Sequence, residues 1–243
     1  MSTNQLEYTD YIQKGHFSIH DWSKCWIDKS TNWHRSIYSP DLLRFYPSCI
    51  ARMGRRSTVL VPLCGKTLDL IWLAGNGEKV IGIEAVEQAC HEFFGENNIP
   101  YVVEKVQGSD CRIFASQADA LDITIFNCDF YALTAQLIGC RCDTVWDRGS
   151  FVAINPDTRV HYAQQLASLM NSGGRSLLSA LEYDYRERHD PGPPFCISES
   201  VANDTFSPFA SIIKLQTTVL PKERFASYGL SCVKEHIFKL TFD

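Results

Sequence analysis

The sequence predicts an α/β protein built on a doubly wound, mostly parallel sheet. Residues 58–63 form an apolar run that enters a tight turn at Gly65, and a helical pattern follows. A second apolar run, 79–83, ends in Glu84. From residue 58 onward, short apolar runs alternate with helical patterns, which is typical of a sheet whose strands are joined by helices.

The unit from the first run to Glu84 predicts a nucleoside site. Glu84 follows Cys64 by twenty positions and stands at the end of a strand. A glycine in the turn lets the backbone approach a ligand closely, and an acid at this spacing can bind ribose hydroxyls.

Two phosphate-binding motifs are excluded. Gly65-Lys66-Thr67 resembles the tail of a nucleotide phosphate loop, but the first glycine of that motif would fall at Leu60, and Pro62 removes a backbone N–H. The G-x-G-x-x-G fingerprint is also missing, and Gly75-Asn76-Gly77 is better interpreted as a helix C-cap and turn. An acid without a phosphate cradle favours a nucleoside ligand, of which S-adenosylmethionine is the common example.

Composition indicates an ordinary soluble protein with one large domain. The chain has 243 residues, of which 45% are hydrophobic, and its net charge is −5. Without a long basic run, binding to nucleic acid is not expected. Residues 1–20 are polar and lack the apolar core of a secretory signal, and no apolar stretch is long enough to span a membrane. We therefore expect a cytoplasmic protein and, without a long apolar seam, a monomer.

The ten cysteines do not predict a metal site or a disulfide framework. They are scattered from Cys25 to Cys232, and the one close pair is Cys140 and Cys142. Scattered cysteines in a chain without a signal are mostly buried and reduced, so no metal is expected.

The elements are expected in a regular order. Residues 1–20 are expected to be flexible, and 21–55 has an aromatic, helical pattern that extends the core at its N-terminus. The expected strands are 58–63, 80–83, 112–116, 122–127, 144–146, 175–181, 212–218 and 233–240. The expected helices are 66–74, 87–97 and 155–171.

Local signals support three of these assignments. Asn155 is expected to cap the third helix, with Pro156 in its first turn, and Gly173-Gly174 to end it. The segments 112–116 and 122–127 suit a hairpin, and the last two strands suit an antiparallel pair. The proline-rich stretch 190–194 is expected to be a stiff loop.

Four motifs, in order, resemble one known family. They are Pro62–Lys66 (PLCGK), Trp146–Gly149 (WDRG), Val152–Pro156 (VAINP) and Pro191–Phe195 (PGPPF). The chain resembles the thiopurine S-methyltransferases from about Asp21 to Leu240, and the animal enzymes more than their plant thiol or halide relatives. The resemblance implies a Rossmann-like methyltransferase with a seven-stranded sheet. It implies one methyltransferase domain over 21–243, in which 21–57 forms a helical lid over the donor site.

The resemblance also implies a set of site residues. S-adenosylmethionine would be the co-substrate and S-adenosylhomocysteine the product, with no metal. The residues that match the family's donor site are Trp22, Trp26, Trp33, Leu63, Gly65, Glu84, Asp129, Phe130 and Arg148. Asp129 and Phe130 depart from the family, because the animal enzymes have Ser-Ile there. Arg148 and Arg224 match the catalytic arginines, and Pro194, Phe195 and Arg224 match the acceptor site.

Several of these residues have a purely structural alternative. The tryptophans could be core, Glu84 could cap the next helix, and Arg148 could pair with Asp147 or Glu182. Two histidines could be general bases. His161 is more easily explained by packing in the middle of a helix, whereas His189 lies beside the proline-rich loop.

The chemistry implied is methyl transfer to the sulfur of a small, flat aromatic or heterocyclic thiol. Two arginines can stabilise a thiolate without carrying protons, so no dedicated base is required. Sulfide, small aliphatic thiols and selenium compounds stay open as acceptors, since acceptor choice lies in the lid and in residues 186–196. A donor-binding protein without catalysis also stays open. A nicotinamide-dependent oxidoreductase would need the missing glycine fingerprint.

Overall fold

The computed structural model describes residues 15–50, 56–188 and 192–243. Within them the sheet has nine strands, in the order β3-β4-β5-β2-β1-β6-β7-β9-β8. The strands are β1 (Thr58–Val61), β2 (Lys79–Glu84), β3 (Tyr101–Lys105), β4 (Arg112–Ser116), β5 (Ile123–Asn127), β6 (Cys142–Arg148), β7 (Met170–Tyr183), β8 (Ala210–Leu220) and β9 (Val233–Phe242). The five central strands, β5, β2, β1, β6 and β7, are parallel, and each edge is completed by antiparallel strands.

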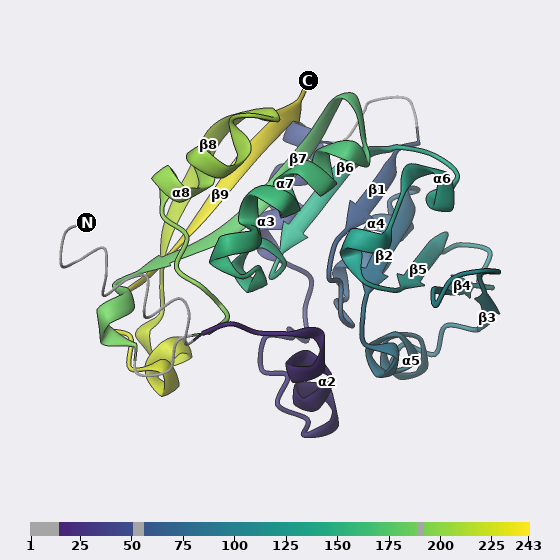
Figure 1. Ribbon diagram of the computed structural model, residues 1–243, viewed down its shortest axis with the longest axis horizontal. Coiled ribbons are helices and arrows are strands. Elements are labelled where there is room, and N and C mark those ends of the chain that lie inside the picture. Colours follow the sequence, from purple (N-terminus) through teal and green to yellow (C-terminus); the bar gives the residue numbers. More distant parts are fainter. Residues whose placement is uncertain (1–14, 51–55, 189–191) are drawn as a thin grey trace.

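Helices cover both faces of this sheet (Figure 1). The α-helices of the described residues are α2 (Ile19–Ile27), α3 (Pro40–Phe45), α4 (Asp69–Gly75), α5 (Glu87–Glu96), α6 (Ala135–Ile138), α7 (Arg159–Ser168) and α8 (Glu199–Phe206), and those from α3 onward pack on the faces. One core cluster joins the sheet to α3, α4 and α5, and a second joins its opposite face to α6, α7 and α8. None of the described helices is long and apolar enough to cross a membrane.

The strand order reverses at β1, which lies between β2 and β6. Ligands of open α/β sheets bind beyond the carboxyl ends of the strands at such a reversal. Helix α2 lies at this end of the sheet in Figure 1. The expected doubly wound, mostly parallel fold is therefore confirmed, and its binding edge faces the N-terminal segment.

The expected number of seven strands was wrong. All eight segments assigned from the sequence are strands, and β3 adds a ninth. Four of the five residues of β3 are exposed at the sheet edge. An edge strand of this kind buries no regular face, so it leaves no alternating pattern to detect.

The predicted helix 155–171 also differs. Residues 156–158 form a 3-10 turn, α7 ends at Ser168, and Gly173 and Gly174 lie inside β7. Asn155 stands at the N-cap position of this turn, followed by Pro156 as expected, but its side chain makes no cap hydrogen bond. Its side chain instead accepts from Phe17 N (2.9 Å) and donates to Phe17 O (2.9 Å), which fixes the N-terminal segment against the sheet edge.

One helix and part of the N-terminal segment also differ from what the sequence predicts. Helix α8 was missed, although Ser198 caps it by accepting from Val201 N. Most of the segment that was expected to be flexible, residues 1–14, lies outside the described residues. His189 and Pro191 also lie outside them. Helix α2 begins at Ile19 with a capping box formed by Ser18 and Asp21.

Candidate active site

The turn after β1 brings its backbone against the next strand. Leu63 and Gly65 both have positive φ, 42° and 52°. Cys64 N donates to Ile83 O (2.8 Å), and Ser150 Oγ donates to Pro62 O (2.6 Å). These bonds hold the turn at the carboxyl ends of β1, β2 and β6.

Glu84 is the last residue of β2 and faces this turn. Its two carboxylate oxygens accept from Gly65 N and Val86 N, each at 2.8 Å. The side chain is almost completely buried, and burial raises the pKa of the carboxyl to about 6. A carboxylate oxygen has two lone pairs, so each oxygen keeps one position for a further donor such as a ribose hydroxyl.

Aromatic residues of the N-terminal segment lie over Gly65. The rings of Trp22 and Trp33 are in edge contact at 5.3 Å, and Trp26 is buried with only 3% of its surface exposed. A methyl group on Gly65 would lie 2.7 Å from His34 Cε1 and 3.4 Å from Trp26 Cζ2. The three tryptophans assigned from the sequence are thus brought together with the Gly65 turn.

His34 belongs to this cover, and sequence reasoning missed it. Its Nε2 is buried and has no hydrogen-bond partner among residues 15–50, 56–188 and 192–243. Burial, followed by the charges of Lys66 and Arg148, lowers the pKa of the imidazole to about 4. The ring is therefore neutral at pH 7, and its Nε2 can still form a hydrogen bond with a ligand.

Asp129 and Phe130 lie just after β5 and have different environments. Asp129 is exposed and caps a 3-10 turn, with Oδ1 accepting from Tyr131 N at 3.0 Å, so its other oxygen has no protein partner in the described residues. Phe130 is buried, with its ring 4.9 Å from that of Tyr162. His161 is exposed on α7 and stacks on Tyr131 at 4.3 Å, as its packing interpretation expects.

Arg148 ends β6 on the opposite face from Asp147. Asp147 is fully buried and accepts from Tyr162 Oη (2.7 Å) and Phe151 N (3.0 Å). Arg148 makes no hydrogen bond or ion pair within the described residues, so neither Asp147 nor Glu182 is its partner. Burial and then repulsion from Arg35 lower the pKa of the Arg148 guanidinium to about 10. A partly buried cation without a partner is costly, and an anionic ligand would relieve that cost.

The acceptor-site residues assigned from the sequence are not all presented to solvent. Arg224 is exposed in the 3-10 segment Lys222–Tyr228, 5.3 Å from the ring of Phe225. Phe195 is buried, and its N–H donates to Val152 O at 2.6 Å. Pro194 O accepts from Tyr183 Oη at 2.7 Å. Of this set, Arg224 and the half-buried Pro194 present surface to an acceptor in the present conformation.

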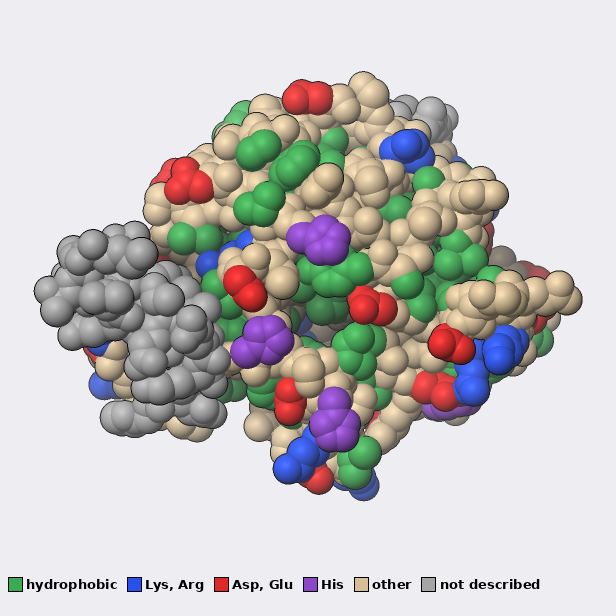
Figure 2. All heavy atoms as spheres, in the orientation of Figure 1, with side chains coloured by type: hydrophobic (Ala, Val, Ile, Leu, Met, Phe, Trp, Pro, Cys, Tyr) green, Lys and Arg blue, Asp and Glu red, His purple; other side chains and the backbone are tan. Residues whose placement is uncertain are grey.

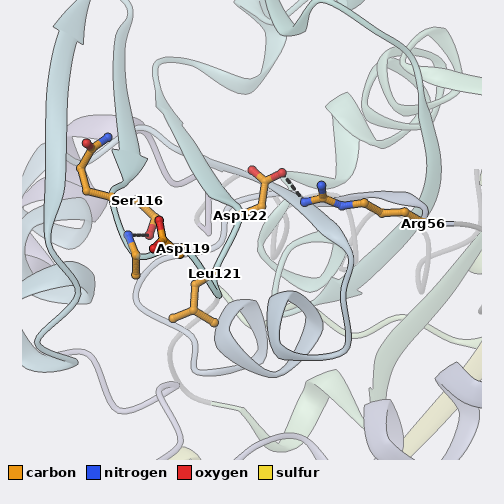
Figure 3. A pocket seen from close by; sticks show the side chains of 7 residues that line it. Arg56, Ser116, Asp119, Leu121 and Asp122 are labelled. Atoms are coloured by element: carbon orange, nitrogen blue, oxygen red, sulfur yellow. Dashed lines mark hydrogen bonds and ion pairs between the residues drawn. The ribbon is translucent and has the colours of Figure 1, made fainter.

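A hollow elsewhere on the surface is not part of this site. It is lined by Arg56, residues 116–119, Leu121 and Asp122, and Arg56 forms an ion pair with Asp122 (Figure 3). Arg56 precedes β1 and Asp122 precedes β5, so the hollow lies at the amino ends of the strands. The described residues contain no cluster of histidine, cysteine or acidic side chains that could hold a metal.

The chain is similar to known proteins of one family over nearly its whole length. The family described as Thiopurine S-methyltransferase (TPMT) matches residues 17–243. A probable thiopurine S-methyltransferase of Danio rerio is 35% identical, covering 92% of this chain and 94% of its own. The thiopurine S-methyltransferase of Felis catus is 31% identical, covering 98% and 96%.

Solved structures share the fold. A Burkholderia thailandensis 1,6-didemethyltoxoflavin-N1-methyltransferase, solved with bound 1,6-didemethyltoxoflavin and S-adenosylhomocysteine, superposes with a TM-score of 0.61. It covers 97% of this chain and 89% of its own at 16% identity.

Proposed function

The chain belongs to the thiopurine S-methyltransferase family, and we propose that it transfers a methyl group from S-adenosylmethionine to the sulfur of a small thiol. The flat, aromatic or heterocyclic thiols suit the aromatic cover best. The observation that carries the proposal is the combination of two residues at one edge of the sheet. Glu84 is a strand-end carboxylate, and Arg148 is a guanidinium that has no partner among the described residues.

The residues present fit the donor. Glu84 keeps acceptor positions for two ribose hydroxyls, and the free oxygen of Asp129 can accept from an adenine amino group. The buried Nε2 of His34 and the guanidinium of Arg148, neither of which has a partner in the part of the chain that the structure describes, are polar groups that a bound ligand would satisfy. We assign the rest of the donor site to Trp22, Trp26, Trp33, Leu63, Gly65 and Phe130.

The protein's part in the reaction is positioning and charge stabilisation. When bound, S-adenosylmethionine supplies an electrophilic methyl group on a sulfonium. Arg148 and Arg224 stabilise the acceptor as a thiolate, which is the nucleophilic form. An alkyl thiol with a pKa near about 8.5 is only a few per cent ionised at neutral pH, whereas aromatic thiols are more acidic. Holding the thiolate in line with the methyl group supplies on the order of 7–11 kcal/mol of the barrier.

Residues 15–50 act as a cover over the donor in this proposal. Trp26 and His34 contact Gly65 from above, and the bonds between Asn155 and Phe17 fix where the segment begins. A cover excludes water from the reacting sulfur and raises the strength of the electrostatic contacts inside. The resemblance matches Pro194 and Phe195 to the wall of the family's acceptor site, and we assign them to that wall here, with Pro194 at the surface and Phe195 buried next to it in the chain.

We further propose a monomeric, cytoplasmic enzyme. All ten cysteines are free, which suits a reducing compartment. On the face shown in Figure 2, basic side chains are few and scattered, and nucleic acid is not among the partners proposed. Light scattering at several concentrations tests the monomer, and a concentration-dependent mass would contradict it.

A methyl-transfer assay tests the central proposal. Radiolabelled S-adenosylmethionine is incubated with benzenethiol, a heterocyclic thiol, an aliphatic thiol and sulfide, and S-adenosylhomocysteine binding is measured separately by calorimetry. We expect label in the aromatic products first. Donor binding without any labelled product would identify a binding protein without catalysis, and absence of donor binding would refute the proposal.

A further inference from the structure

A third arginine, Arg35, is close enough to Arg148 and Arg224, the two arginines that the resemblance assigns to catalysis, for its charge to act on both. We propose that the acceptor thiol carries a carboxylate and that Arg35, with Arg224 at the rim, binds this carboxylate while Arg148 faces the sulfur. The inference rests on the proposed function and narrows it to a class of substrate, the thiol carboxylic acids.

Strand register places the group on one face of the sheet. Arg148 of β6 pairs with Ser179 of β7, and Ser179 pairs with Ile237 of β9. Paired residues, and residues two apart on a strand, point to the same face, so Arg148, Ser179 and Glu235 share it. Ser179 Oγ donates to Glu235 Oε1 (2.7 Å), and Arg35 Nη2 lies 4.0 Å from the same oxygen. Arg35 reaches this face from the loop between α2 and α3, which covers the donor site.

The guanidinium groups keep their hydrogen-bonding capacity. Within the described residues, Arg35, Arg148 and Arg224 donate no hydrogen bond to protein, although each guanidinium has five N–H donors. The 4.0 Å separation between Arg35 and Glu235 is too long for a hydrogen bond. The side chain of Arg35 is only 18% exposed, so water satisfies few of its donors.

The carboxylates near the three arginines are already engaged. Asp69 is 2% exposed and accepts from Ser39 N (2.7 Å) and from Trp146 Nε1 (2.8 Å). Asp41 Oδ1 accepts from Gln216 Nε2 (3.4 Å), and burial, then the charge of Glu235, raises the pKa of the Asp41 carboxyl. Glu235 Oε1 is shared between Ser179 and Arg35.

Repulsion among the arginines supports the same conclusion. The charge of Arg35 lowers the pKa of both Arg148 and Arg224, after the larger effect of burial in each case. One thiolate can offset the positive charge of one of these guanidinium groups but not of all three. A second anionic group on the acceptor relieves the others, and the planar guanidinium fork matches a carboxylate in two-point contact.

A matched pair of acceptors tests the inference. 4-Mercaptobenzoate and its methyl ester share the ring and the thiol, and they differ in one negative charge. The wild-type enzyme should prefer the acid in kcat/KM by on the order of 10- to 100-fold, as expected for hydrogen bonds to a charged group. The ester has the more acidic thiol, so thiol ionisation alone would give the opposite preference.

The variant Arg35→Gln should reduce this preference by on the order of 10-fold or more, mainly through KM for the acid. Arg112→Gln is the matched control, because Arg112 is an exposed arginine on β4 that pairs with Glu87. It should keep the full preference. Calorimetry with S-adenosylhomocysteine checks that each variant is folded.

Two results would overturn the inference while leaving methyl transfer intact. One is an equal kcat/KM of the wild type for the acid and the ester. The other is an equal loss of kcat/KM for the acid and the ester in Arg35→Gln. If neither acceptor nor any neutral thiol is methylated, the proposed function itself fails. Should Arg35→Gln not fold, Arg35→Lys and a salt series on the wild type replace it. Raising the salt should then raise KM for the acid and not for the ester.

Discussion

At the scale of single residues, Arg148 combines two properties that matter for catalysis. It is partly buried and it has no protein partner among the described residues. Its charge is therefore available to an anion formed during the reaction, where it is worth more than in water.

Replacing Arg148 tests that role. Arg148→Ala should lower kcat with a thiol acceptor by on the order of 10²-fold, as for other losses of a group that stabilises transition-state charge. Donor affinity should change much less. Steady-state assays measure kcat, and calorimetry measures the affinity for S-adenosylhomocysteine. Equal losses in kcat and in this affinity would remove Arg148 from the catalytic step. Arg186→Ala serves as a control, because Arg186 is exposed and pairs with Asp184.

Glu84 gives the site a pH dependence. Burial raises the pKa of its carboxyl to about 6, so without ligand it takes up a proton as the pH falls through 6. In the proposed donor site the protonated form lacks the charge that we assign to the ribose hydroxyls, so affinity for S-adenosylhomocysteine should fall between pH 7 and pH 5. Calorimetry across this range measures the slope. Glu84→Gln should bind weakly at every pH, and a slope equal to that of the wild type would assign the titration to another group.

Sequence reasoning predicted these two residues for different reasons. Glu84 follows from strand end and spacing alone, because both are local. Arg148 was assigned by resemblance, and its lack of a partner is visible only in three dimensions. Arg35 was missed altogether, since its meaning depends on Glu235, two hundred positions away, and no local pattern reports such a contact.

At the scale of elements, the turn after β1 and the N-terminal cover form one contact. Gly65 has a φ of 52° and no space for a side chain, because a methyl group there would lie 2.7 Å from His34 Cε1. The glycine is therefore needed for two reasons, backbone conformation and contact with the cover.

A comparison with Gly139 distinguishes the effect of backbone conformation from the effect of contact with the cover. It also has positive φ, 83°, but a methyl group there would meet nothing within 4 Å. Gly65→Ala and Gly139→Ala should both lose on the order of 1 kcal/mol of stability from backbone strain. Only Gly65→Ala should also displace the cover and weaken donor binding. Thermal unfolding measures the loss of stability, and calorimetry measures donor affinity. Equal donor affinity in both variants would show that His34 can move away from the new methyl group without weakening donor binding.

Central elements were predicted better than edges and connections. β1, β2 and β6 are buried on both faces, so continuous apolar runs reveal them. β3 is exposed, and Asn155 imitates a helix cap while binding Phe17. Asn155 shows that a residue at a helix-cap position can use its side chain for a contact with a residue 138 positions away.

At the scale of the whole molecule, the two halves of the sheet meet at the site. β2 contributes Glu84, β1 the Gly65 turn and β6 Arg148, while β9 contributes Glu235. The cover closes over them from the N-terminus. A ligand at this place contacts segments from most of the chain, so binding should stabilise the fold as a unit.

Thermal unfolding with ligand tests this expectation. At a concentration of 100 times its dissociation constant, S-adenosylhomocysteine should add about 2.7 kcal/mol to the free energy of unfolding. For a domain of this size each kcal/mol raises Tm by about 2–4 °C, so a shift of roughly 5–10 °C is expected. The nicotinamide dinucleotide NAD, at the same concentration, should give none, since the Gly65 turn lacks the glycines that hold a pyrophosphate. A comparable shift with both ligands would mean that the turn after β1 binds phosphate, and the assignment of the site to a phosphate-free nucleoside would then be wrong.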